Sequence, residues 1–189
     1  MKKNKIVTMT EIAVFASIGF VLDVLASFYS GFFVNGGSIS FALLAVVILS
    51  FRRGAGAGVC CGLVIGLLDL TDGFYTIADT WYNGFFQISL DYILTYMLVG
   101  LVGLIKPLIK NNFVLVISLA TLVGGLLKYL CHFISGVLFW PEFPNQPIGE
   151  RVIFSLVYNG SYMIPTIIVC VVVSVLISIK FKDLFNVKD

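Results

Sequence analysis

Long apolar segments divide this chain and constrain its fold more than any other feature. A helix that crosses a membrane needs about 20 apolar residues, because the hydrocarbon core is roughly 30 Å thick and each residue rises about 1.5 Å. Of the 189 residues, 59% are hydrophobic and 12% are charged, which is too apolar a balance for a soluble globular domain. We therefore expect one all-α integral membrane domain over residues 1–189, with six transmembrane helices. The candidate spans are 6–28, 38–51, 54–70, 85–105, 113–139 and 152–179.

Ten of the twelve basic residues lie on one side of these segments. They precede the first segment, lie in two short connections and follow the last segment: Lys2, Lys3, Lys5, Arg52, Arg53, Lys106, Lys110, Lys180, Lys182 and Lys188. The other connections are richer in acidic residues. An even number of spans places both chain ends on the same side, and the positive-inside rule makes that side the cytoplasm. We expect cytoplasmic N and C termini, a multi-pass location in a cell membrane, and the lipid bilayer as a partner.

Polar residues lie inside three of the segments at a similar depth. Counting about 1.5 Å per residue from the outer end, His132 lies roughly 12 Å deep and Lys128 roughly 18 Å deep. Asp91 lies roughly 9 Å deep on the preceding segment and Asn159 roughly 10 Å deep on the following one. Charged groups inside a membrane are costly and usually mark a functional cavity. We therefore favour a binding pocket over the plainer alternative, an Asp91–Lys128 ion pair beside a core histidine.

The chemistry of this layer indicates the kind of ligand it would bind. Within the fifth segment, Gly136 and Trp140 share the face of Lys128 and His132, because the four are spaced four residues apart. A carboxylate can neutralise an organic cation, and aromatic rings can stack on it or form cation–π contacts. The aromatic candidates in the longest outer connection are Tyr75, Trp81 and Tyr82. A flat, cationic, nitrogen-rich heterocycle suits this set.

Small residues recur at helical spacing in the third segment. Gly54, Gly58, Gly62 and Gly66 are each four residues apart and form a stripe against which another helix can pack closely. Packing inside the molecule is the reading we favour, and docking of a partner protein is the alternative.

Several function classes lack their sequence signals. The segment "GAGAGVCCG" has no lysine and is not a phosphate-binding loop, and no G-x-S-x-G motif is present. One histidine, with no cysteine or histidine pairs at ligand spacing, disfavours a zinc site. The basic residues lie along one membrane edge and do not suggest nucleic-acid binding. We expect no enzymatic activity, metal or cofactor, and cysteines that serve as small packing residues.

Five stretches resemble one known family. "LLKYLCHFISGVLFW", "SLVYNGSYMIPT", "LDYIL", "NGGSISFALLAVVILSFRRGAGAG" and "TEIAVFAS" are similar to the thiamine-specific substrate-binding (S) components of energy-coupling factor (ECF) transporters, the ThiT or YuaJ family. The resemblance covers residues 10–179. It implies the six-helix S-component fold in a bacterial plasma membrane and capture of thiamine from outside. It also implies two partners, a transmembrane coupling protein and a pair of cytoplasmic ATPases.

The resemblance carries over to individual positions. The implied ligand-binding residues are Asp91, Tyr92, Lys128, His132, Gly136, Trp140, Tyr158 and Asn159, with Tyr75, Trp81 or Tyr82 as the loop aromatic. Ala13 and Ser17 match the helix face that docks on the coupling protein. Asp91 stands where a glutamate is frequent in the family, and Phe154 stands where some members have tyrosine. Lys128 is expected to touch the ligand or to hold Asp91.

Two alternatives remain open from the sequence. The first is an S component for another flat vitamin or precursor. The second is a stand-alone secondary transporter coupled to protons, in which Asp23, Asp69 and Asp91 would carry the protons. The absence of a visible sequence repeat argues against the second alternative.

Overall fold

Helices make up nearly all of the residues described by this computed structural model. The structure describes residues 2–31, 33, 37–76, 80–108, 112–139 and 146–185. The long helices are α1 (Lys2–Tyr29), α3 (Ala55–Asp72), α6 (Phe113–Phe139) and α7 (Ile148–Lys180). Shorter elements are α2 (Ala42–Arg53) and a 3₁₀ turn, η3 (Lys182–Phe185), after α7.

A further long helix runs from Trp81 to Leu108 and changes its winding along the way. It begins as α4 (Trp81–Ile88), with Thr80 as its N-cap; the Thr80 side chain accepts a hydrogen bond from the Asn83 amide. A π-helical turn, η1 (Ser89–Leu94), follows, and then α5 (Thr95–Gly100) and a 3₁₀ segment, η2 (Leu101–Leu108). Within the described residues, five helices are long and apolar enough to cross a membrane.

The sixth expected span forms the short helix α2, which lies at the centre of the molecule. Its 12 residues would extend only about 18 Å. All positions from Ala42 to Phe51 are buried, so the segment is apolar on every side because it is surrounded by other helices rather than by lipid. The core around α2 includes Ile65 of α3, Tyr96 of α5 and Ile117 of α6.

The glycine stripe of α3 packs inside the molecule, as the favoured reading predicted. A Cβ on Gly62 would overlap the backbone carbonyl of Tyr96, and one on Gly66 would overlap that of Tyr92. A Cβ on Gly58 would likewise overlap the side chain of Ser50 and the backbone carbonyl of Gly100. Gly54 differs, because it forms the turn between α2 and α3 with a φ of 91°. Small residues thus let α3 approach the backbone of helix 81–108 directly.

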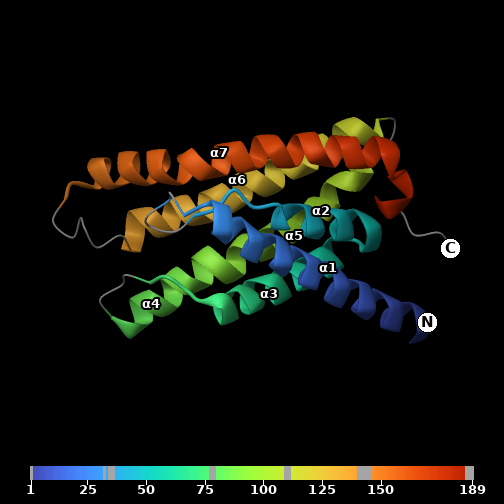
Figure 1. Cartoon of the computed structure of the whole chain (residues 1–189), viewed down its shortest axis with the longest axis horizontal. Helices are drawn as coiled ribbons and strands as arrows, with labels where there is room; N and C mark the ends of the chain where they lie inside the picture. The colour runs from blue at the N-terminus through green and yellow to red at the C-terminus, as the bar shows by residue number, and fades with distance from the viewer. Residues whose placement is uncertain are drawn as a thin grey trace.

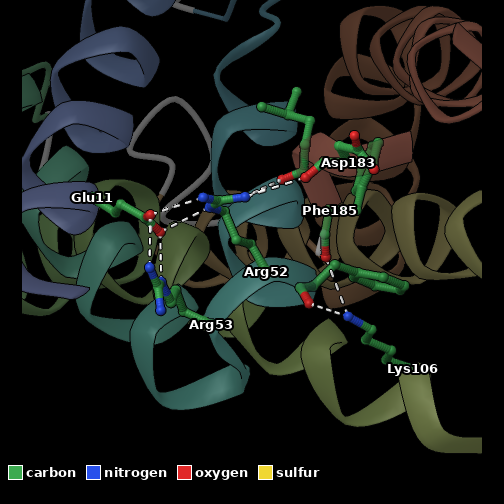
Figure 2. Close-up of polar contacts among 8 residues, drawn as sticks. Glu11, Arg52, Arg53, Lys106, Asp183 and Phe185 are labelled. Carbon is green, nitrogen blue, oxygen red and sulfur yellow. Dashed lines mark hydrogen bonds and ion pairs between the residues drawn. The ribbon is translucent and has the colours of Figure 1, made fainter. Parts of the chain in front are cut away.

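Both chain ends lie at one end of the bundle, and α6 and α7 run side by side along its length (Figure 1). This agrees with the predicted placement of the termini on one side. Glu11 of α1 meets the turn between α2 and α3 at this end. Its carboxylate accepts hydrogen bonds from Arg52 at 2.9 and 3.0 Å and from Arg53 at 2.7 and 2.8 Å (Figure 2).

The same end is tied to the C-terminal segment (Figure 2). Arg52 Nη1 donates to the carbonyls of Asp183 and Leu184 at 3.3 and 3.4 Å. Lys106 Nζ donates to the carbonyls of Phe51 and Phe185 at 2.6 and 3.2 Å. We call Glu11, Arg52, Arg53 and Lys106 the inner cluster. It joins α1, α2, η2 and η3 through cations that the sequence predicted at the cytoplasmic edge.

Candidate functional site

A cavity of about 370 Å³ lies among the helices, and its lining includes the C-terminal ends of α1 and α3. Its walls come from α1, α3, the helix over residues 81–108, α6 and α7, together with the segment that precedes α2. All three helices of the predicted polar layer contribute to it: Asp91, Lys128, His132 and Asn159 all line this cavity. The structure therefore brings together the four residues that depth counting placed in one layer.

Asp91 is held from α6 by two side chains. Its Oδ1 lies 3.2 Å from Nδ1 of His132, and its Oδ2 accepts a 2.6 Å hydrogen bond from Ser135 Oγ. Asp91 belongs to the π-helical turn η1, and such single turns inside α-helices occur frequently at functional sites. The carboxylate is 20% exposed, so it remains open to the cavity.

Asn159 forms a second anchored group on α7. Its Nδ2 donates to the backbone carbonyl of Ser155 at 2.9 Å and to the carbonyl of His132 at 3.2 Å. Its Oδ1 accepts a 2.5 Å bond from the hydroxyl of Tyr162. Gly136 faces this group, since a Cβ there would overlap Ser155 Oγ and lie 3.1 Å from Asn159 Nδ2. Glycine at this position thus lets α6 and α7 close around the amide.

Aromatic side chains line the outer part of the cavity. The hydroxyl of Tyr92 accepts a 2.8 Å hydrogen bond from the amide of Tyr75, which fixes the end of the loop after α3. Tyr158 and Phe154 of α7 stack at 5.8 Å between ring centroids with an interplanar angle of 3°. All four rings line the cavity and offer flat surfaces to a planar ligand.

Lys128 does not hold Asp91, and that part of the sequence prediction is wrong. Its ammonium lies 3.6 Å from the ring centroid of Tyr96 and attracts the carboxylates of Asp23 and Asp69. The reason is the helical geometry: Lys128 lies one turn deeper than His132, over the ring of Tyr96 on α5. His132 and Ser135 hold Asp91 instead.

The other predicted residues divide into three groups. Tyr75 lines the cavity, whereas Trp81 and Tyr82 do not. These two start α4 and point outward, with Trp81 84% exposed, so the structure favours Tyr75 among the three loop aromatics. Trp140 lies outside the described residues, as does part of the first outer connection. Ala13 and Ser17 are exposed on α1, away from the cavity.

Several lining residues were not predicted as ligand contacts. Ser135 and Ser155 were missed because serines are common packing residues in membrane helices. Their spacing offered a signal, since Ser155 lies four residues before Asn159 and Ser135 lies three after His132. Asp23 and Tyr96 were missed as a pair, because the 2.5 Å bond from Tyr96 to Asp23 joins positions 73 residues apart.

The lining of the cavity indicates the kind of ligand that it could bind. It combines carboxylates, an ammonium, an amide and several aromatic rings, which suits a flat cation with ring nitrogens. Within the described residues, no group of three or more histidine, cysteine, aspartate or glutamate side chains could hold a metal ion.

Comparison with known proteins identifies the family. The family model described as thiamine transporter protein (Thia_YuaJ) matches residues 9–186. The chain belongs to this thiamine transporter family. Membership confirms the resemblance found in the sequence and fits a multi-pass protein of the bacterial plasma membrane.

Individual members of the thiamine transporter family match over nearly their whole length. The thiamine transporter ThiT of Bacillus subtilis is 32% identical over 184 residues, which cover 91% of this chain and 90% of the relative. ThiT of Lacticaseibacillus paracasei is 29% identical over 200 residues, covering 100% of this chain and 96% of the relative. The named relatives are transporters rather than enzymes.

A solved structure supports the fold. ThiT from Listeria monocytogenes superposes with a TM-score of 0.78 at 24% identity, covering 97% of this chain and 100% of that one. The S-component fold expected from the sequence is thereby confirmed.

Proposed function

We propose that this chain captures thiamine from outside the cell, as the substrate-binding S component of an ECF transporter. The observation that carries the proposal is the anchored carboxylate of Asp91 in an aromatic-lined cavity of about 370 Å³. Thiamine is a flat cation with a charged thiazolium and an aminopyrimidine, so it offers a charge, planar rings and hydrogen-bonding groups to this cavity. Family membership supports thiamine as the ligand.

Each described group has a proposed role. Asp91 balances the thiazolium charge or accepts a hydrogen bond from the aminopyrimidine, held in place by His132 and Ser135. Asn159 offers the second lone pair of its Oδ1 to a donor of the ligand, since its Nδ2 already donates to Ser155 and His132. Tyr75, Tyr92 and Tyr158 form the flat walls, and Gly136 keeps α6 close to Asn159. Trp140 is proposed from the resemblance as a further stacking residue.

Transport in this proposal depends on partners. The chain has no phosphate-binding loop of its own, so a coupling protein and an ATPase pair would supply the energy. Ala13 and Ser17 are exposed on α1 and, being small, would allow close approach of a partner helix. The Ser17 hydroxyl bonds back to the carbonyl of Ala13 at 2.9 Å, which leaves this face without a free donor.

The ligand is tested by fluorescence titration of the purified chain. Thiamine, riboflavin, pyridoxal and hydroxymethylpyrimidine are added separately, and quenching of tryptophan emission gives each dissociation constant. Thiamine is expected to bind most tightly. Tighter binding of another member of this panel would replace thiamine by that vitamin as the ligand.

The coupling is tested by uptake of labelled thiamine into proteoliposomes. Uptake is expected only when the partner proteins and ATP are present. Uptake by this chain alone under a pH gradient would instead support a proton-coupled transporter. Ala13→Trp is expected to abolish ATP-driven uptake and leave thiamine binding intact. Ile168→Trp, an equally bulky change at an exposed position of α7, serves as the control.

A further inference from the structure

Arg151 is one of two basic residues that lie away from the cytoplasmic edge, and the other, Lys128, lines the cavity. It belongs to the first turn of α7, where the positive-inside rule and the dipole of its own helix both disfavour a cation. Arg151 does not line the cavity, so the proposed ligand contacts leave it without a role. Its contacts with the neighbouring helix supply one.

The guanidinium of Arg151 caps the end of α6. Its Nη2 donates to the backbone carbonyl of Leu138 at 2.9 Å and also to that of Val137. α6 ends at Phe139, and the last four carbonyls of a helix have no donor within the helix itself. A positive charge at this end is also favoured by the dipole of α6. Arg151 thus clamps together two helices that run side by side (Figure 1).

Two further side chains of α7 make the same kind of contact deeper in the molecule. Ser155 Oγ donates to the carbonyl of Phe133 at 2.7 Å, and Asn159 Nδ2 donates to that of His132 at 3.2 Å. Arg151, Ser155 and Asn159 are spaced four residues apart and therefore share one face of α7. All three donate to the backbone of α6, and we call them the α7 seam.

The α7 seam holds the part of α6 that carries the site. His132 is bonded to the seam through its carbonyl and to Asp91 through its ring, and Ser135 donates to the same carboxylate. Arg151 fixes this stretch at its outer end, because its two carbonyl acceptors lie within one turn beyond Ser135. A small slide or rotation of α6 against α7 would therefore change how Asp91 is held.

We propose that Arg151 is a positioning residue: from outside the cavity, it fixes the outer end of α6 against α7 and thereby slows the dissociation of thiamine. The effect is transmitted through the backbone of α6 to the two side chains that orient Asp91. The Nε of Arg151 is buried without a hydrogen-bond partner among the residues that the structure describes, so the clamp depends on Nη2 and on the charge. This role rests on the proposed thiamine-binding function and extends it to a residue that does not touch the ligand.

The first test measures how fast thiamine leaves the purified chain, by stopped-flow tryptophan fluorescence. Arg151→Met keeps a long apolar stem and removes the charge and the donors. Its dissociation rate is expected to rise at least about threefold, since affinity changes within one complex arise mostly in dissociation. Arg151→Lys keeps a cation at the end of α6 and is expected to give a smaller rise. An unchanged rate in Arg151→Met, or an equal rise in Arg151→Lys, would overturn the proposal.

A matched control separates positioning from general stability. Arg52 also donates to two backbone carbonyls, those of Asp183 and Leu184, but it belongs to the inner cluster and does not line the cavity. Arg52→Met is expected to lower the midpoint of thermal unfolding and to leave the thiamine dissociation rate unchanged. An equal rise of the rate in Arg52→Met and Arg151→Met would show a general loosening of the fold and would overturn the positioning role.

A double-mutant cycle tests the route through Asp91. If Arg151 acts on the orientation of this carboxylate, Arg151→Met should raise the dissociation rate less in a Ser135→Ala background, where one of the bonds that orient Asp91 is already lost. Additive effects would contradict this route. Arg151→Gln, which loses the charge but stays polar, replaces Arg151→Met in every comparison if the latter does not fold. If the unaltered chain binds no thiamine, the proposed function fails, and the same rates measured with the vitamin that does bind decide the role of Arg151.

Discussion

Nδ1 of His132 lies 3.2 Å from Oδ1 of Asp91, and this contact joins α6 to the π-helical turn of helix 81–108. A second contact from the same helix, Ser135 Oγ to Asp91 Oδ2 at 2.6 Å, fixes the other carboxylate oxygen. The carboxylate is thus oriented before any ligand arrives, and preorganisation of this kind increases affinity because less order is lost on binding.

Ser135→Ala is expected to weaken thiamine binding by about tenfold or more. The change removes the hydrogen bond from Ser135 to the Asp91 carboxylate, and a hydrogen bond to a charged group contributes about 1.5–3 kcal/mol. Without this bond, the carboxylate can rotate away from its binding orientation. Isothermal titration of the purified variant measures the effect. Ser118→Ala is the matched control, because Ser118 lies on the same helix, does not line the cavity, and its hydroxyl donates to the carbonyl of Val114. Equal affinities of the two variants would contradict the role of Ser135.

Gly136→Ala should reduce thiamine affinity while the chain still folds. The added methyl group would overlap Ser155 Oγ and crowd Asn159 Nδ2, so α7 must shift and carry the amide with it. Overpacking of this kind costs typically about 1–3 kcal/mol. Gly149→Ala, where a Cβ meets nothing within 4 Å, provides the comparison. Thermal unfolding in detergent and thiamine titration together separate a local shift from general destabilisation.

Gly62→Ala is expected to destabilise the fold more than it alters the site. A Cβ at Gly62 would overlap backbone atoms of Tyr96 and Met97, which cannot rotate away as a side chain would. α3 must then move off helix 81–108, with a loss of about 1–3 kcal/mol or more. The measurement is the midpoint of thermal unfolding. Gly56→Ala, an open position on the same helix, should leave the midpoint nearly unchanged, and an equal fall in both variants would contradict this packing.

Glu11→Gln should lower thermal stability and leave thiamine affinity unchanged. Both arginines of the inner cluster bond to this one carboxylate, so Glu11→Gln removes the negative charge that the two guanidinium groups share. Hydrogen bonds to charged groups contribute about 1.5–3 kcal/mol each when shielded, and less at partly exposed positions such as these. Glu150→Gln, an exposed position, is the control for a simple change of charge. A fall in thiamine affinity would contradict the separation of the inner cluster from the cavity.

Much of this architecture could be predicted because a membrane-spanning chain carries long apolar segments and an uneven distribution of charge in its sequence. Span length, the basic residues at one edge and the depth of Asp91, His132 and Asn159 all follow from counting along helices. The glycine spacing predicted close packing, and the structure supplied its partner, the backbone at Tyr92 and Tyr96.

The failures have a common cause, which is that depth along a helix does not define direction around it. Lys128 lies at a predicted depth, but its ammonium lies over the ring of Tyr96 rather than beside Asp91. The π-helical turn at Asp91 changes the direction of the residues after it, and no residue pattern in "SLDYIL" announces that turn. Trp81 and Tyr82 were plausible as loop aromatics, but the Thr80 cap starts a helix there and directs them outward.

The most direct test of the central claim is the thiamine affinity of Asp91→Asn beside that of the unaltered chain. The substitution keeps the shape and removes the charge that His132 and Ser135 orient. Loss of one partner of a buried charged pair costs about 2–5 kcal/mol, so the dissociation constant should rise roughly thirtyfold to several-thousandfold. Equilibrium titration monitored by tryptophan fluorescence gives both values. An unchanged dissociation constant in a folded variant would contradict the assignment of Asp91 as the residue that recognises thiamine.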